Sequence, residues 1–239
     1  MGDDICPITM PGIHDVFWPF LVAELTETEN QNTKILDAGA GYGPLTKKLY
    51  ENGYNVSACD AHPETFKFDK LRCERTNLNN MLPYADSSFD AVVAVEVLEH
   101  LTDHGRFFHE CRRILKHNGK LIVSTPNILS LKSRLLFFMS GFFYSFKPLS
   151  RGRDDQFQHV TARTLDQYYY IAKQNGFTVG NVRTDKYQST SKSMIWLWPL
   201  LYGFTKLKGI DFYIHNQIKI LLGRILFISF KKKVLPSNI

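Results

Sequence analysis

Three polar side chains near the middle of the chain have a spacing suited to chemistry. Glu96, Glu99 and His100 follow the apolar run 91–95, and positions i, i+3 and i+4 share one face of a helix. Such a run is typical of a central parallel strand, and ligands bind beyond the carboxyl ends of these strands. Histidine accepts a proton near neutral pH, so this face could deprotonate a hydroxyl group. The alternative is that Glu99 and His100 form only structural hydrogen bonds at the helix start.

A second candidate site is a glycine-rich stretch that follows a short apolar strand ending with Asp37. Gly39, Gly41 and Gly43 alternate there, and an amphipathic segment comes next. Glycines permit positive φ and a close approach to a ligand, while the unpaired N–H groups of a helix start favour polar ligand groups. A dinucleotide site wants its third glycine where Pro44 stands, so the spacing disfavours a dinucleotide. A turn that binds no ligand is the remaining alternative.

The second expected strand, residues 54–60, ends in Asp60. The two oxygens of this carboxylate could accept both hydroxyl groups of a ribose, an arrangement that glycine-turn folds use. The sequence His62-Pro63-Glu64 also suits a helix start, so Asp60 could instead begin the next helix. Both interpretations place Asp60 beside the glycine turn.

An acidic residue followed by G-x-G-x-G resembles motif I of the class I S-adenosylmethionine-dependent methyltransferases. In that family the turn passes beneath the methionine part of the cofactor, and the acidic residue lies near its amino group. The segment from Asn77 to Asp90, with Leu82-Pro83 and Ser88-Phe89, also resembles the family. Asn77 stands where the family has a carboxylate that accepts from the adenine amino group, and its carbonyl could do likewise without charge assistance. Over residues 34–126 the resemblance implies that S-adenosyl-L-methionine contacts Asp37, Gly39, Ala40, Gly41, Gly43, Asp60, Ala61, Asn77, Leu78 and Glu96.

Two further segments resemble particular groups of enzymes within this methyltransferase family. Glu96-Val-Leu-Glu99-His100 and Thr125-Pro126-Asn127 resemble the O-methyltransferases of ubiquinone synthesis and bacterial glycan or lipid methyltransferases. We predict His100, His159 and Glu99 as catalytic residues, because a hydroxyl nucleophile benefits from losing its proton and His100 or His159 could accept it near neutral pH. The set Glu96, Glu99, His100 and His159 also resembles the metal-holding residues of small-RNA 2′-O-methyltransferases, and oxygen-rich ligation suits an ion such as Mg²⁺. The general-base, metal and purely structural roles stay open.

Charge is distributed unevenly along the chain, whose net charge is +6. Residues 1–129 carry 12 basic and 18 acidic side chains, whereas residues 130–239 carry 17 basic and 5 acidic ones. The basic half could meet anionic lipid, nucleic acid or a phosphorylated substrate, or it could be a solvated face. It also contains apolar clusters at 128–147 and 196–198. These clusters favour either shallow insertion into an anionic membrane surface or a buried lid that forms the acceptor pocket.

We therefore predict an α/β fold with a Rossmann-like, seven-stranded, mostly parallel sheet, helices on both faces, and an apolar, basic helical lid. Residues 1–239 form a single methyltransferase domain, in which 127–150 and 190–222 are insertions on the acceptor side. Within it we expect a third strand at 71–78, a helix that continues to Asn118, and a last, antiparallel strand at 225–230. The four cysteines show no metal or disulfide spacing and no signal for secretion is found, so we expect a cytoplasmic protein, peripheral to the inner face of a membrane.

The predicted function is O-methylation of a small or lipid-linked acceptor, such as a quinone precursor or a glycan, with S-adenosyl-L-methionine and, in the metal version, a divalent cation. One alternative is an RNA 2′-O-methyltransferase, which needs aromatic platforms open to stacked bases along a basic groove. The other is a non-catalytic nucleotide-binding or scaffold protein. Nothing in the sequence sets the oligomeric state.

Overall fold

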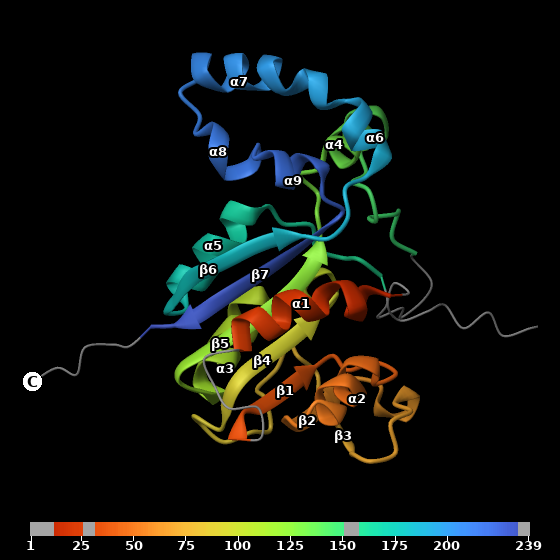
Figure 1. Cartoon of the computed structure of the whole chain (residues 1–239), viewed down its shortest axis with the longest axis vertical. Coiled ribbons are helices and arrows are strands. Elements are labelled where there is room, and N and C mark those ends of the chain that lie inside the picture. The colour runs from red at the N-terminus through yellow and green to blue at the C-terminus, as the bar shows by residue number, and fades with distance from the viewer. Residues whose placement is uncertain (1–11, 26–31, 151–157, 234–239) are drawn as a thin grey trace, which may run out of the picture.

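A seven-stranded sheet forms the centre of the molecule, with the strand order β3-β2-β1-β4-β5-β7-β6 (Figure 1). The computed structural model describes residues 12–25, 32–150 and 158–233. The strands are β1 (Lys34–Ala38), β2 (Asn55–Asp60), β3 (Cys73–Arg75), β4 (Phe89–Val95), β5 (Leu115–Pro126), β6 (Phe177–Thr184) and β7 (Ile225–Lys232).

The sheet is mostly parallel, as predicted. Strands β1 to β5 pair in parallel, whereas β7 runs antiparallel to both of its neighbours, β5 and β6. Because β6 and β5 therefore point the same way, the connection from β6 to β7 lies at the edge of the sheet where β1, β4 and β5 end. The prediction of an antiparallel last strand is confirmed.

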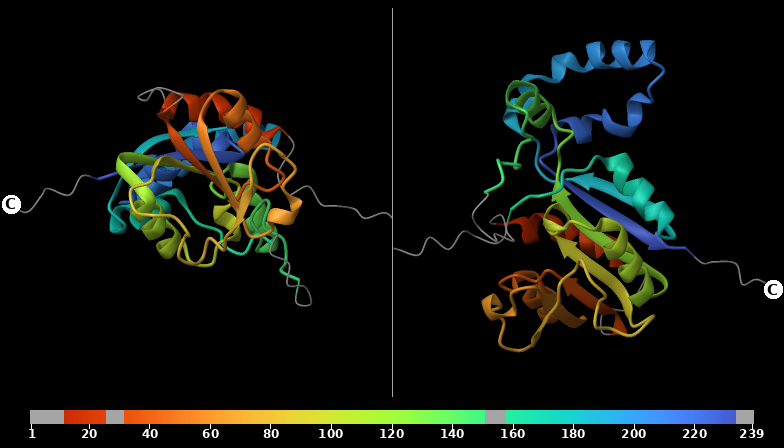
Figure 2. Two further views of the ribbon diagram at one scale, coloured as in Figure 1. Left: turned by 90° about the horizontal axis from the view of Figure 1, so that it is seen from below. Right: turned by 180° about the vertical axis from the view of Figure 1, so that it is seen from behind.

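Helices cover both faces of the sheet (Figure 2). One face carries α1 (Ile13–Leu25) and α2 (Pro44–Glu51), and the other carries α3 (His104–Ile114) and α5 (Leu165–Gln174). Successive strand residues point to opposite faces, so Val92 packs with the α3 side while Val93 packs with the α1 side. Both are fully buried, as expected of a central strand.

Two sequence predictions about boundaries are wrong. The third strand spans only Cys73–Arg75, and α3 ends at Ile114 rather than at Asn118. Strand β5 begins at once with Leu115, which pairs with Phe89 of β4. The N–H of Ser88 also donates to the carbonyl of Ile114 at 2.7 Å. Sheet pairing thus takes the backbone groups that a longer helix would have used.

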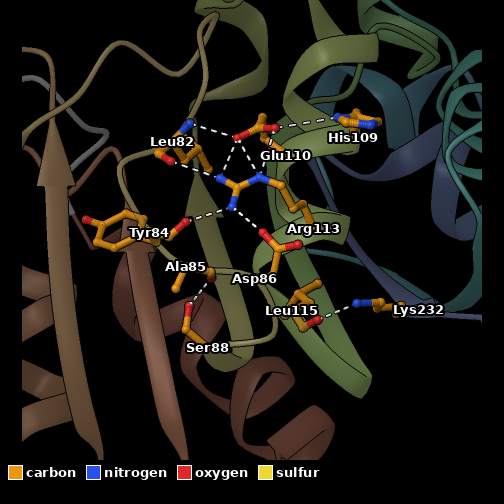
Figure 3. A network of polar contacts seen from close by, with 10 residues as sticks. All are labelled: Leu82, Tyr84, Ala85, Asp86, Ser88, His109, Glu110, Arg113, Leu115 and Lys232. Carbon is orange, nitrogen blue, oxygen red and sulfur yellow. Dashed lines mark hydrogen bonds and ion pairs between the residues drawn. The ribbon is translucent and has the colours of Figure 1, made fainter.

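A polar network on α3 fixes the loop that leads into β4 (Figure 3). The guanidinium of Arg113 donates to the carbonyls of Leu82 and Tyr84 at 2.9 and 2.7 Å and to Asp86 at 2.8 Å. The carboxylate of Glu110, which is itself paired with Arg113, accepts from the N–H of Leu82 at 2.8 Å. The 82–88 segment is therefore anchored to α3 before the chain enters the sheet.

A layer of short helices lies beyond the carboxyl edge of the sheet (Figure 1). We call it the cap; its elements are α4 (Leu131–Ser140), α6 (Ser189–Ser193), η4 (Ile195–Leu197), α7 (Trp198–Leu207), α8 (Phe212–His215) and α9 (Ile218–Leu222). Two other short turns, η2 (Pro63–Thr65) and η3 (Leu98–His100), lie nearer the strand ends. The two chain segments of the cap meet where Arg134 donates to the side chain of Asn216 at 2.7 Å and to the carbonyl of His215 at 2.9 Å. That the cap acts as a lid stays a prediction.

Candidate active site

The glycine turn follows β1 directly. Gly39, Gly41 and Gly43 all have positive φ, at 82°, 52° and 87°. A Cβ on Gly39 would lie 2.4 Å from Cγ2 of Val97, and one on Gly43 would lie 2.7 Å from the ring of Phe66. Both positions therefore require glycine for conformation and for packing. The contact with Val97 also places the turn against the segment that follows β4.

The turn is held from β2 as well. The N–H groups of Gly39 and Ala40 both donate to the carbonyl of Cys59, at 2.8 and 3.0 Å. The carboxylate of Asp60 accepts from the N–H of Gly41 through Oδ2 and from the N–H of His62 through Oδ1. Asp60 thus supports the turn itself, and its predicted bond to a ribose would use the remaining lone pairs.

Asp37 is buried beneath the turn. Its Oδ2 accepts a hydrogen bond from the Thr46 hydroxyl at 2.6 Å. Burial raises the pKa of Asp37 to about 7, even though the bond from Thr46 acts in the opposite direction. A bound cation, such as the amino group predicted here for the cofactor, would favour the ionised form.

The other predicted cofactor contacts lie at the ends of β2 and β3. The carbonyl of Ala61 accepts from Arg75 at 2.8 Å, and Leu78 is buried. Asn77 is exposed, and its side-chain oxygen accepts from the N–H of Asn79 at 3.0 Å. The adenine contact predicted for Asn77 would therefore share this oxygen with its own loop.

Glu96 does not lie on a helix with Glu99 and His100, so that part of the prediction is wrong. Glu96 has a φ of 54°, in the left-handed region, and only Leu98–His100 form a helical turn, η3. Its carboxylate accepts from the Ser124 hydroxyl at 2.9 Å, and Ser124 also accepts from the Glu96 N–H. Burial raises the pKa of Glu96 to about 7. The tight turn after β4, rather than a helix, sets the positions of these groups.

Glu99, His100 and His159 nevertheless come together. Each can offer one ligand atom so that the three atoms lie within 4.8 Å of one another. The rings of His100 and His159 lie 4.9 Å apart between centroids, and Nε2 of His159 is 4.0 Å from Oε1 of Glu99. Among the described residues, Glu96 is outside this group of three. The convergence of the two histidines matches the sequence prediction, whereas their chemical roles stay predictions.

Backbone hydrogen bonds explain the convergence. The N–H groups of Val160 and Thr161 both donate to the carbonyl of Glu99, at 2.9 and 3.1 Å. Nδ1 of His100 lies 3.0 Å from the carbonyl of Gln158, which can only accept, so Nδ1 carries a proton. The 158–161 segment is thereby fastened across η3.

The electrostatics of the three residues differ from those of exposed groups. Glu99 is fully buried, and burial, followed by the nearby Glu96, raises its pKa well above the ordinary value. Its Oε2 accepts from the Thr125 hydroxyl at 3.3 Å, but Oε1 has no hydrogen-bond partner. Burial lowers the pKa of His159 to about 4, with a further contribution from His100. A neutral imidazole and an unpaired carboxylate oxygen are suitable ligands for a divalent cation, so these residues fit the metal prediction.

Several residues of the site were missed at the level of sequence. Ser124 and Thr125, at the end of β5, hold Glu96 and Glu99, and the hydroxyl of Tyr168 lies 3.5 Å from that of Thr125. Two hydroxyl residues at the carboxyl end of an expected central strand were the available signal. Tyr168 offered none, because its position on α5 is typical of a core aromatic residue.

The chain shares its fold with solved structures of other proteins. The chain has the fold of the S-adenosylmethionine-dependent methyltransferases: the structure of one from Mesorhizobium loti covers 91% of this chain and 98% of its own, with a TM-score of 0.57 and 16% identity. The YcgJ protein of Bacillus subtilis covers 93% of this chain and 100% of its own, with a TM-score of 0.59 and 17% identity.

Sequence comparison gives a partial family match and curated relatives. Residues 36–123 match the model of the methyltransferase domain family. The ubiquinone biosynthesis O-methyltransferase of Psychrobacter arcticus is 31% identical over 61% of this chain and 59% of its own length. The human mitochondrial enzyme of the same name is 32% identical over 62% of this chain and 42% of its own. The chain thus matches little more than half the length of the curated bacterial relative.

Proposed function

We propose that the protein transfers the methyl group of S-adenosylmethionine to a hydroxyl oxygen of an amphiphilic acceptor, such as a quinone precursor or a lipid-linked sugar, at a membrane surface. The observation that carries the proposal is the cluster of Glu99, His100 and His159 beside the glycine turn, where Val97 touches Gly39. The names of the relatives support oxygen as the methylated atom.

The cofactor supplies an activated methyl group, and the chain's own residues align the acceptor for in-line displacement. The N–H groups and carbonyls that fix the turn and the 158–161 segment make this side of the pocket rigid. In the general-base version, Nε2 of His100 would take the proton of the acceptor hydroxyl, because Nδ1 already carries one.

In the metal version Glu99, His100 and His159 hold a divalent cation, which would lower the pKa of a bound hydroxyl. The unpaired Oε1 of Glu99 supports this version, and so does the lowered pKa of His159, which makes it a weak proton acceptor. Measuring activity in the presence of a chelator distinguishes the metal version from the general-base version. Activity that is lost in chelator and restored by Mg²⁺ or Mn²⁺ supports the metal, while activity that persists in chelator supports His100 as the base.

The membrane part of the proposal rests on the outer surface of the cap. Large apolar side chains of the cap that do not line its groove are exposed on α4, η4, α7, α8, α9 and the segment between α7 and α8: Leu135, Phe137, Phe138, Met139, Trp196, Leu200, Phe204, Leu207, Ile210, Tyr213, Ile214 and Ile218. Exposed apolar side chains in this number on one layer of a protein are typical of an interaction site. The sequence that contains them, residues 130–239, carries 17 basic and 5 acidic side chains. The contact we propose is peripheral, through shallow insertion of the exposed apolar side chains. Within the described residues no helix is long and apolar enough to cross a bilayer.

Liposome flotation tests the membrane contact. We expect the protein to float with anionic vesicles of phosphatidylglycerol and phosphatidylcholine, and less with phosphatidylcholine alone. Phe138→Asp with Leu207→Asp, at positions 85% and 88% exposed, should reduce flotation. Met81→Asp, which changes an apolar side chain that is 68% exposed outside the cap, is the matched control. Failure to bind vesicles, together with salt-sensitive RNA binding, would support the RNA alternative instead.

Methyl transfer is tested directly with a membrane-lipid extract. Purified protein is incubated with the extract and with S-adenosylmethionine that carries a deuterated methyl group, and lipids that gain the label are found by mass spectrometry. We expect label in a hydroxylated lipid. If the folded protein binds neither S-adenosylmethionine nor its demethylated product in calorimetry, the enzyme proposal fails and the scaffold alternative remains.

A further inference from the structure

An apolar groove of about 460 Å³ lies where the cap meets the site. It is lined by the end of α4 and the turn after it: Leu136, Phe142, Phe143, Tyr144, Ser145, Phe146, Lys147 and Pro148. The lining is almost entirely aromatic and aliphatic, and the volume is within the range that binds small organic ligands.

The groove and the active-site cluster share a wall. Phe146 is buried, and its ring lies 5.3 Å from the ring of His159 in an edge-to-face contact. The ring of His159 also lies 4.9 Å from the ring of His100, between centroids. A molecule that extended from the groove past Phe146 would therefore present its next atoms to the two histidines.

The groove is preformed by specific contacts. Phe137 and Phe143 stack at 4.3 Å with their planes 13° apart, which ties α4 to the turn. The N–H of Tyr144 donates to the Ser133 hydroxyl at 3.1 Å, and the ammonium of Lys132 lies 3.8 Å from the centre of the Tyr144 ring. Phe143 also packs against the main core. A site that is already shaped loses less free energy on binding.

We propose that this groove binds the apolar chain of the acceptor, an isoprenoid or acyl chain, and so directs its hydroxylated head toward His100 and His159. This inference rests on the proposed function. The groove suits uncharged hydrocarbon: of the described residues that line it, only Lys147 is charged, and it can keep its ammonium in water while its stem contributes apolar surface.

Binding of a hydrocarbon chain to the groove can be measured without catalysis. The full-length protein is titrated with cis-parinaric acid, whose fluorescence rises in apolar sites, and the probe is then displaced by straight-chain alcohols of increasing length, all kept monomeric. We expect the affinity of the alcohols to rise about fourfold for each added CH₂ until the groove is filled. An affinity that does not depend on chain length would overturn the proposal.

Matched variants place the binding site. Phe142→Ser and Leu136→Ser change groove residues that are 43% and 40% exposed, and we expect each to weaken chain binding about tenfold or more. Phe138→Ser is the control, since Phe138 is on the same helix, is 85% exposed and does not line the groove. If Phe138→Ser weakens binding equally, the hydrocarbon binds on the outer surface of the cap, and the proposal for the groove is wrong.

A separate readout distinguishes this inference from the proposed function. Calorimetry with S-adenosylhomocysteine measures binding at the cofactor site. We expect the same affinity in all three variants, and this result would also show that they are folded. If the groove binds the hydrocarbon chain but the protein does not bind S-adenosylhomocysteine, only the methyltransferase proposal fails. If the protein binds S-adenosylhomocysteine but not the hydrocarbon chain, only the proposal for the groove fails.

Discussion

Oδ2 of Asp60 accepts a hydrogen bond from the N–H of Gly41 at 2.9 Å, which joins the end of β2 to the turn after β1. The two residues are 19 positions apart in the chain. A carboxylate that accepts two backbone N–H groups lowers the cost of holding Gly41 at positive φ. The turn is therefore shaped before any cofactor arrives, and the same carboxylate remains at its edge.

Asp60→Asn should weaken binding of S-adenosylhomocysteine by about ten- to a hundredfold, because the change removes the charge from a hydrogen-bond acceptor, whose contribution is about 1.5–3 kcal/mol. Titration calorimetry measures the affinity. Glu51→Gln, at an exposed carboxylate on α2, is the control and should bind normally. An unchanged affinity in Asp60→Asn would remove both the ribose role and the support of the turn.

Asn127→Ala should destabilise the protein by about 2–4 kcal/mol, since it leaves several buried backbone groups unpaired. The Asn127 amide donates to the carbonyls of Ile220 and Gly223 at 2.7 and 2.8 Å and accepts from the N–H of Leu129 at 3.0 Å. Urea denaturation gives the free energy of unfolding, and hydrogen exchange should show faster exchange at 218–223. Asn52→Ala, at an exposed helix end, should have little effect.

His104 should make stability depend on pH. Arg163 donates to its Nδ1 at 3.1 Å, so Nε2 carries the proton that bonds the carbonyl of Leu98, and the ring is neutral. Burial lowers its pKa to about 4. Between the ordinary value of about 6.5 and this value only the unfolded chain binds the proton, so acidification favours unfolding, by up to about 1.4 kcal/mol per pH unit from this site.

The measurement compares wild type with His104→Asn by urea denaturation from pH 7 to pH 4.5. We expect the variant to be less stable at pH 7 and the difference to shrink as the pH falls. His117→Asn, at an exposed position, reports the effect of a histidine substitution alone. A difference that stays constant with pH would contradict a neutral, buried His104.

Glu99→Gln should stabilise the protein and abolish cation binding. The raised pKa of Glu99 means that the folded state holds a proton that the unfolded state releases, so the carboxyl costs stability as the pH rises above its ordinary value of about 4.3. An amide carries no such cost. Thermal unfolding in chelator should show the variant gaining on wild type from pH 5 to pH 8, while Mn²⁺ should raise the midpoint of wild type only. A midpoint that Mn²⁺ leaves unchanged in wild type would exclude the cation.

The glycine turn and the strands on either side of it were largely predictable, because their signals are local. Each signal comes from residues that are close together in the sequence: the alternating glycines after a strand, the apolar run 91–95 and the acidic residue that ends β2. The structure has the corresponding turn and strands where they were expected. The end of α3 was not predictable in this way. Residues 116–118 are compatible with a helix, but Leu115 pairs with Phe89, and long-range pairing overrides local preference.

The meeting of Glu99 with His159 depends on contacts that spacing does not encode. Their proximity results from the bonds of the Val160 and Thr161 N–H groups to the Glu99 carbonyl. Helical spacing correctly drew attention to Glu99 and His100 but gave the wrong reason, since Glu96 is in a left-handed conformation. The arrangement of the cap was likewise hidden, because Asn127 and Arg134 hold segments more than 80 residues away.

The position of β7 has a consequence for how the protein is made. It is the last of the seven strands to be synthesised, yet it is an interior strand, between β5 and β6. Until residues 225–232 have left the ribosome, the long edge of β5 has no partner on that side and is open to mispairing. We expect a nascent chain that has not yet released β7 to be a better chaperone client and protease substrate than the finished protein, although all of its glycine turn is already present.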